Sequence, residues 1–408
     1  MSAVLDRFLR YVQYDTQSDE TSDTYPSTRK QLVLLKHLAD ELRSVGLTDA
    51  AIDQYGYVTA TVPPTSRKAV PAIGFIAHVD TSPELTGANV RPIVHRSYDG
   101  RDLVLPDDST AVLRIADWPS LAERLGDDIV TASGTTLLGA DNKAGVAEIV
   151  TAAEYLVAHP DIPHGPIKIA FTPDEEVGRG TQHFDVAAFG ATYAYTMDGS
   201  ARGELEYESF SADAMTLTFV GFNTHPGYAK DRLINAIKVA ADFIGHLPRE
   251  MSPEATDGYD GFVHPYVLQG GTERASVRFI VRDFKTAALK EKEDMLERLA
   301  VAAASRYGAR VEVLIEEQYR NMREVLDRHP HVVEYAREAI RRAGMTVRER
   351  SIRGGTDGSK LSFMGLPTPN IFAGEHNFHS RLEWVSVQDM EKAVEVIVNL
   401  AAIWNERA

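Results

Sequence analysis

Short apolar runs alternate with amphipathic segments through the first half of the chain. Residues 70–77 (VPAIGFIA), 167–171 and 192–197 are apolar runs typical of buried strands. Residues 2–13, 27–45 and the stretch that ends at Ala158 have apolar residues at helical spacing. Strand–helix–strand alternation predicts an α/β domain with a mostly parallel sheet covered by helices on both faces.

The pattern changes character near residue 209. Three segments alternate apolar and polar residues around positions 215–219, 277–281 and 311–315, whereas 232–244 and 286–304 have helical spacing. With the short apolar run 262–268, the order is β-α-β-β-α-β, the pattern of a small α+β domain. We therefore predict an inserted domain at residues 210–320, with the first domain formed by 1–209 and 321–408. In the last part we expect helices at 329–343 and 389–404 and a strand at 368–372.

Composition narrows the classes of partner. Apolar residues make up 44% of the chain and charged residues 25%, as in ordinary globular proteins. The formal charge of −16 argues against nucleic-acid and anionic-membrane partners. The first helix carries charges, unlike a signal peptide, and 393–404 is too short to span a membrane, so we expect a cytoplasmic protein. The sequence leaves the oligomeric state open, with a homodimer as one option.

Histidines and acids follow several of the apolar runs. The acid triplet Asp174–Glu176 follows the run 167–171, and His78, Asp141, Asp198 and His379 have a similar local context. Because ligands bind outside the carboxyl ends of strands in open α/β sheets, we predict one metal site assembled from five strand ends. The chain has no cysteine, so imidazole and carboxylate are the available zinc ligands. Taken singly, the triplet also fits a solvated loop and each histidine a core position.

The residue types indicate roles within such a site. Asp141 lies between glycines at the start of a helix and suits a carboxylate shared by two cations. His78 suits a direct ligand, and Asp80 a carboxylate that orients its imidazole. A hydrolytic site also needs a carboxylate that moves a proton from water to the leaving amine. Glu175 and Glu176 are the candidates, one as base and one as ligand, and these arguments do not say which is which.

Eight motifs spread over the whole chain point to one family. They are HVDTS (78–82), GADNKAG (139–145), TPDEEVGRG (172–180), MDG (197–199), NTHPGYAKDRLINA (223–236), NMREVLDRHPH (321–331), RGGTDGSKLSFMGLP (353–367) and HNFHSRLEWVS (376–386). The set closely resembles the peptidase T family, the tripeptide aminopeptidases of the co-catalytic zinc metallopeptidase clan that includes glutamate carboxypeptidases and aminoacylases. Around His379 the chain has His-Ser-Arg-Leu where the family usually has His-Gly-Lys-His. This difference concerns substrate preference, since the ligand itself is kept.

The resemblance implies a di-zinc aminopeptidase that releases the N-terminal residue from tripeptides. His78 and Asp198 would hold one zinc ion, and Glu176 and His379 the other. Asp141 would bridge both ions, and the peptide bond after it would be cis.

The resemblance also implies roles around the metals. Glu175 would be the general base and Asp80 the partner of the first histidine. Residues 210–320 would form a lid, from which His225 would reach the site to polarise the scissile carbonyl. Arg282 and Arg353 would anchor the substrate, since a guanidinium suits a peptide carboxylate.

Two alternatives to a tripeptidase stay open. The first is a deacylase or dipeptidase of the same clan, which a substrate panel distinguishes. The second is a metal-binding scaffold without turnover, for which a substituted base or bridging ligand is the expected signature. Glu175 and Asp141 are both present, which favours an enzyme.

Overall fold

The computed structural model describes residues 2–408, which form two compact units. Unit 1 comprises residues 2–207, 322–350 and 356–408, and unit 2 comprises 208–321 and 351–355. The expected boundaries at 209/210 and 320/321 lie beside these limits. The segment Ser351–Gly355, expected in the C-terminal part of the first domain, lies in unit 2 instead.

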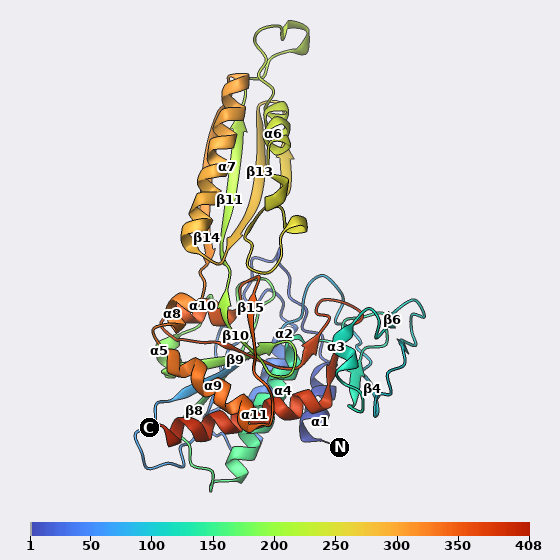
Figure 1. Ribbon diagram of the computed structural model, residues 1–408, viewed down its shortest axis with the longest axis vertical. Coiled ribbons are helices and arrows are strands. Elements are labelled where there is room, and N and C mark those ends of the chain that lie inside the picture. Colours follow the sequence, from blue (N-terminus) through green and yellow to red (C-terminus); the bar gives the residue numbers. More distant parts are fainter. Residues whose placement is uncertain (1) are drawn as a thin grey trace. The chain divides into compact units, whose positions relative to one another are not determined.

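An eight-stranded sheet, in the order β1-β2-β8-β3-β9-β16-β10-β15, forms the centre of unit 1 (Figure 1). Its strands are β1 (Ala51–Ile52), β2 (Val58–Val62), β3 (Ile73–His78), β8 (Ile167–Thr172), β9 (Tyr193–Gly199), β10 (Glu204–Ser209), β15 (Arg348–Ile352) and β16 (Asn370–Phe372). The central strands β8, β3, β9 and β16 pair in parallel. The pairs β1–β2, β2–β8 and β10–β16 are antiparallel.

The sheet is therefore mixed, and the prediction of a mostly parallel sheet was wrong toward its edges. The link from β9 to β10 shows why: it spans only residues 200–203. A parallel connection needs a crossover of about a dozen residues or more. Strand β10 accordingly runs antiparallel to β16.

Helices cover both faces of this sheet. The helices of unit 1 are α1 (Ala3–Tyr11), α2 (Gln31–Ser44), α3 (Pro119–Ala122), α4 (Ala140–Ala158), α5 (Val186–Phe189), α8 (Arg323–Leu326), α9 (Pro330–Arg342), α10 (Asp357–Phe363) and α11 (Val387–Glu406), of which α3 packs on the smaller sheet of β7 (Ile129–Thr131) and β18 (Trp384–Ser386) through Leu121. Helix α4 packs on β3 and β9. Helices α1 and α11 in turn pack against α4. On the other face, Ile76 lies in a core cluster with Phe189 of α5 and Leu361 of α10. Within residues 2–408, no helix combines the length and apolar character needed to cross a membrane.

Two smaller sheets flank the main one in unit 1. Strands β4 (Ile93–His95), β7 (Ile129–Thr131), β17 (Glu375–His376) and β18 (Trp384–Ser386) form an antiparallel sheet in the order β17-β18-β7-β4, and β5 (Leu103–Val104) pairs with β6 (Val112–Leu113). Residues 84–128 form a long, mostly polar segment dotted with Gly and Pro, and these short strand pairs order it. Pairing of β7 with β18 brings the segment before Asp141 next to the segment after His379.

Unit 2 follows the order β-α-β-β-α-β (Figure 1). Its elements are β11 (Ser211–Val220), η1 (Pro226–Tyr228), α6 (Ala236–Gly245), η2 (Arg249–Met251), η3 (Pro253–Ala255), β12 (Phe262–Gly270), β13 (Arg274–Asp283), α7 (Thr286–Tyr307) and β14 (Arg310–Tyr319). The strands form an antiparallel sheet in the order β12-β13-β11-β14. Alternate residues of β11, such as Leu217 and Phe219, are buried against α6 and α7. Helix α6 begins four residues later than predicted because the Asn235 side chain caps it, accepting from Ile237 N.

A buried ion network joins α11 to two loops of unit 1. Asp389 is fully buried, and its Oδ2 accepts a 2.7 Å hydrogen bond from Arg124 Nε. Its other oxygen pairs with Arg202, which also bonds Asp127. Ser386 Oγ donates to Asp127 at 2.9 Å. The network fixes the turn that follows Asp198 against the start of α11.

Asp389→Ala is expected to lower the free energy of unfolding by about 3–5 kcal/mol, because it leaves buried Arg124 without its main partner. Denaturant unfolding of the metal-stripped protein measures the loss without a contribution from ion binding. The matched control is Glu395→Ala on the same helix, since Glu395 is half exposed and pairs with Lys392 at 2.8 Å. That change should cost less than about 1 kcal/mol. Equal losses of unfolding free energy in the two variants would show that the buried network stabilises the fold no more than an exposed ion pair does.

Candidate metal centre

Three adjacent parallel strands place their carboxyl ends at one edge of the main sheet. The register pairs His78 of β3 with Thr172 of β8, and Ile76 with Thr196 of β9. The ends of the three strands are therefore in register, and they place side by side His78, the acid triplet after β8 and Asp198 near the end of β9. These residues come together as expected for ligands beyond strand ends.

Two other ligand candidates do not come from strand ends, which corrects the expectation of five. Asp141 is the second residue of α4 and follows the irregular loop 132–139. His379 lies in the turn between β17 and β18 and has a positive φ of 54°. Both reach the site because β7 and β18 pair next to it. The peptide bond between Asp141 and Asn142 is cis, as the resemblance implies.

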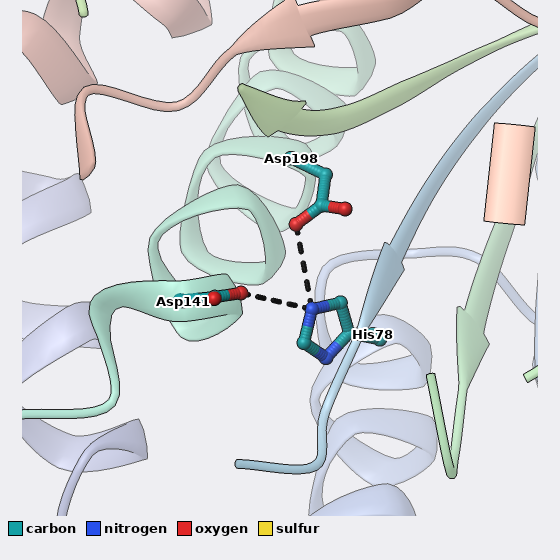
Figure 2. Close-up of side chains that lie close together, drawn as sticks. All are labelled: His78, Asp141 and Asp198. Carbon is teal, nitrogen blue, oxygen red and sulfur yellow. Dashed lines mark hydrogen bonds and ion pairs between the residues drawn. The ribbon is translucent and has the colours of Figure 1, made fainter. Parts of the chain in front are cut away.

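His78, Asp141 and Asp198 form the first cluster of ligand atoms (Figure 2). His78 Nε2 lies 3.0 Å from Asp141 Oδ1 and 3.4 Å from Asp198 Oδ1. Its Nδ1 faces two oxygens of Asp80, the backbone O at 3.1 Å and Oδ1 at 3.3 Å. A hydrogen on Nδ1 satisfies these acceptors and leaves the Nε2 lone pair directed into the cluster.

Asp141, Glu176 and His379 form the second cluster. His379 Nε2 lies 2.8 Å from Glu176 Oε2 and 3.4 Å from Asp141 Oδ2. Asp141 thus directs one oxygen to each cluster, as a carboxylate bridging two ions would.

The donor set fits two divalent cations. All donors are imidazole nitrogens or carboxylate oxygens, and two ligands of a tetrahedral zinc ion lie about 3.3 Å apart. The separations of 2.8–3.4 Å within the clusters match that spacing. Glu176 Oε1 is buried and has no hydrogen-bond partner among residues 2–408, so an ion would satisfy it.

The electrostatics of the centre also call for cations. Burial raises the pKa of Glu176 to about 8, and burial likewise raises the pKa of Asp198. Hydrogen bonds with Asp141 and Glu176 raise the pKa of His379 to about 11. For Asp141 burial opposes ionisation, but the two imidazoles outweigh it and lower the pKa below the usual aspartate value. The protein's own groups thus leave an excess of buried acids that divalent ions would neutralise.

Glu175 lies beside the two clusters but belongs to neither. Burial raises its pKa well above the usual glutamate value, and the carboxylates of Asp357 and Asp198 add to the rise. A carboxyl group that is not a ligand but lies beside the ligands has the placement required of a proton carrier.

Two other acids hold the turn that carries Glu175 and Glu176. The Asp80 carboxylate accepts the backbone N–H of Glu175 at 3.0 Å and of Glu176 at 3.1 Å. Asp80 therefore orients the turn as well as the first imidazole. Asp174, fully buried with φ 60°, accepts bonds from Ser27 N at 2.6 Å and from the Gln31 side chain at 2.7 Å.

These contacts also explain a boundary in the N-terminal part. Residues 27–30, predicted as helical, instead precede α2, because Ser27 bonds the Asp174 carboxylate through both its backbone N–H and its hydroxyl.

Sequence reasoning also missed Glu84, whose Oε2 lies 3.5 Å from His379 Nδ1. Its closeness to the HVDTS motif was the available signal.

Three predicted residues lie in unit 2. His225 is exposed at the start of η1, where its Nδ1 accepts from Gly227 N at 3.1 Å. Arg353 donates to the backbone oxygens of Gly258 at 2.7 Å and Asp260 at 2.9 Å, so it fastens that loop. Arg282 donates to Arg353 O at 3.1 Å. Substrate binding by the two arginines remains a prediction.

Known proteins resemble the chain over its whole length. The model of peptidase family M20/M25/M40 matches residues 139–402. A peptidase T from Geobacillus thermodenitrificans is 49% identical over 405 residues, which cover 99% of this chain and 98% of that protein. A peptidase T from Bacillus velezensis is 49% identical over 406 residues, covering 99% of each.

Solved structures share the fold. Aminopeptidase PepT from Bacillus cereus matches with a TM-score of 0.77 and 22% identity, covering 99% of this chain and 98% of that one. A dinuclear metal-binding peptidase of the M20 family from Bacillus subtilis matches with a TM-score of 0.69 and 16% identity, covering 99% and 98%. The likeness includes the mixed central sheet with its covering helices.

Proposed function

The chain belongs to peptidase family M20/M25/M40, and we propose that its site holds two zinc ions and removes the N-terminal residue from tripeptides. It is a hydrolase of peptide bonds, and the peptidase T relatives at 49% identity support the activity of a tripeptide aminopeptidase.

The observation that carries the proposal is the position of Asp141. Its two oxygens lie 3.0 Å and 3.4 Å from imidazole nitrogens of different clusters. Asp198 would complete the ligands of one ion and Glu176 those of the other. Zinc is proposed from the nitrogen and oxygen donors and from the resemblance to co-catalytic zinc peptidases.

The reaction divides between the ions and the protein side chains. Two bound zinc ions would activate a water molecule and polarise the scissile carbonyl. Glu175 would take a proton from the attacking water and give it to the leaving amine, so that the peptide C–N bond breaks. The Asp80 carboxylate would hold Glu175 in place by accepting the backbone N–H of Glu175, and Asp80 would keep His78 in one orientation.

Residues of unit 2 would complete the site around the substrate. In this proposal unit 2 is a lid, His225 polarises the carbonyl oxygen, and Arg282 and Arg353 bind the peptide carboxylate. The hydrogen bond of His225 supports this role: because Nδ1 accepts from Gly227 N, a neutral imidazole carries its hydrogen on Nε2, where it could be donated to a carbonyl oxygen. Location in the cytoplasm and assembly as a homodimer are further proposals, tested by cell fractionation and by light scattering.

Metal content and hydrolysis measured on one preparation test the proposal. We expect about two equivalents of zinc per chain and release of the N-terminal residue from a tripeptide. A panel of dipeptides and N-acyl amino acids should show much slower turnover. Faster turnover of those substrates would favour a dipeptidase or deacylase, and loaded protein without turnover would favour a scaffold.

His225→Ala should lower kcat by about 10²–10³-fold, the usual effect of removing one donor to a developing oxyanion. Metal content should stay at the parent level, because His225 lies outside both ligand clusters. Steady-state kinetics on a tripeptide provide the measurement, with His246→Ala as the control on another exposed histidine of unit 2. A kcat within a few-fold of the parent value would remove His225 from the mechanism.

A further inference from the structure

A buried glutamate holds the loop that presents Asp141. Glu383 is 1% exposed and lies between His379 and α11. Its Oε2 accepts the backbone N–H groups of Leu138 at 2.7 Å and Gly139 at 2.8 Å. Its Oε1 accepts the N–H of Asp141 itself at 3.0 Å. One carboxylate therefore satisfies three amides of the turn that enters α4.

The local backbone needs this partner. Gly139, the residue before α4, has no side chain to cap the helix and adopts φ 80°. The unpaired N–H groups at a helix start are costly to bury, and together they favour an anion. Glu383 supplies that anion from a distant part of the chain.

The same residue reaches the second cluster. Glu383 N donates to Ser380 O at 3.2 Å, which closes the turn that follows His379. The side chain of Glu383 thus holds the bridging aspartate, and its backbone holds the turn of another ligand.

We propose that Glu383 is a positioning residue that sets the Asp141 carboxylate between the two metal positions. The inference rests on the proposed role of Asp141 as shared ligand. Partners that orient metal ligands are worth about 10–100-fold in metal affinity. Because Asp141 serves both ions, loss of Glu383 should weaken both positions and not one.

The test is Glu383→Gln, which keeps the shape but places an NH₂ donor against at least one backbone N–H. Metal-free protein is titrated with Co²⁺, whose visible absorption reports the ligand geometry, and chelator competition gives the affinities. We expect affinities lower by about 10–100-fold at both positions and a changed Co²⁺ spectrum, with far-UV circular dichroism unaltered. Parent affinities and a parent spectrum would overturn the proposal.

Two further variants distinguish a failure of the Glu383 proposal from a failure of the proposed function. Glu148→Gln is the matched control: Glu148 is equally buried on α4, but its carboxylate has no hydrogen-bond partner within residues 2–408. It should bind Co²⁺ like the parent protein. Asp141→Asn run in parallel tests the shared ligand: if it too binds normally, the proposed function fails and not only the role of Glu383.

Hydrogen exchange of the metal-free parent protein keeps the proposal testable if Glu383→Gln does not fold. The peptide that contains Leu138–Asp141 should exchange slowly before any metal is added, because Glu383 already pairs its amides. Full exchange of these amides within seconds would show that the loop is not preformed, which contradicts the inference.

Discussion

Glu175→Gln is expected to slow tripeptide hydrolysis by about 10²–10⁴-fold while both metals stay bound. Glutamine keeps the size and the backbone contacts of the residue but cannot accept a proton from water. The turn itself should persist, since Asp80 holds it through backbone N–H groups that the substitution leaves unchanged. Metal analysis and single-turnover kinetics on the same sample separate loss of chemistry from loss of metal.

Glu176→Gln is the matched partner of that experiment, one residue away. Its Oε2 lies 2.8 Å from His379 Nε2 in the second cluster, whereas Glu175 belongs to no cluster. This variant should lose one metal equivalent and its activity with it. If Glu175→Gln instead lost metal and Glu176→Gln stayed loaded but slow, the two roles would be exchanged.

Asp141→Asn is expected to weaken metal binding at both positions, at least about a hundredfold, because even residues that only orient ligands are worth 10–100-fold. The amide presents a single oxygen, so it cannot face His78 and His379 as the carboxylate does. Hydrolysis should fall below detection at stoichiometric zinc. Isothermal titration of the metal-free protein measures the two affinities.

Asp198→Asn is the control that distinguishes a carboxylate shared by both ions from a carboxylate that binds only one. Asp198 belongs only to the cluster with His78, so its amide should weaken one position and spare the other. Equal effects of the two substitutions would mean that Asp141 is not the bridge.

Local sequence signals were sufficient to predict the placement of the candidate ligands that follow buried strands. Continuous apolar runs end just before His78 and at Met197, and the structure aligns those ends in β3 and β9. The order of elements in unit 2 was also readable, because alternation and helical spacing are local patterns. Its function as a lid is a matter of motion and stays a prediction.

Non-local contacts were not readable from the sequence. The antiparallel pairing of β10 with β16 depends on the four-residue link before β10, and the apolar pattern gives no information about that link. Asp174 looked like a third candidate in the acid triplet, yet it bonds Ser27, distant in sequence. Glu383 gave no local signal, since its three partners lie 242–245 residues earlier.

Anomalous scattering at the zinc edge from zinc-soaked crystals tests the central claim most directly. The account predicts two peaks, one contacted by His78, Asp141 and Asp198 and the other by Asp141, Glu176 and His379, with one Asp141 oxygen on each. A single peak, or two peaks of which either lacks Asp141, would contradict a shared carboxylate at the centre of this site.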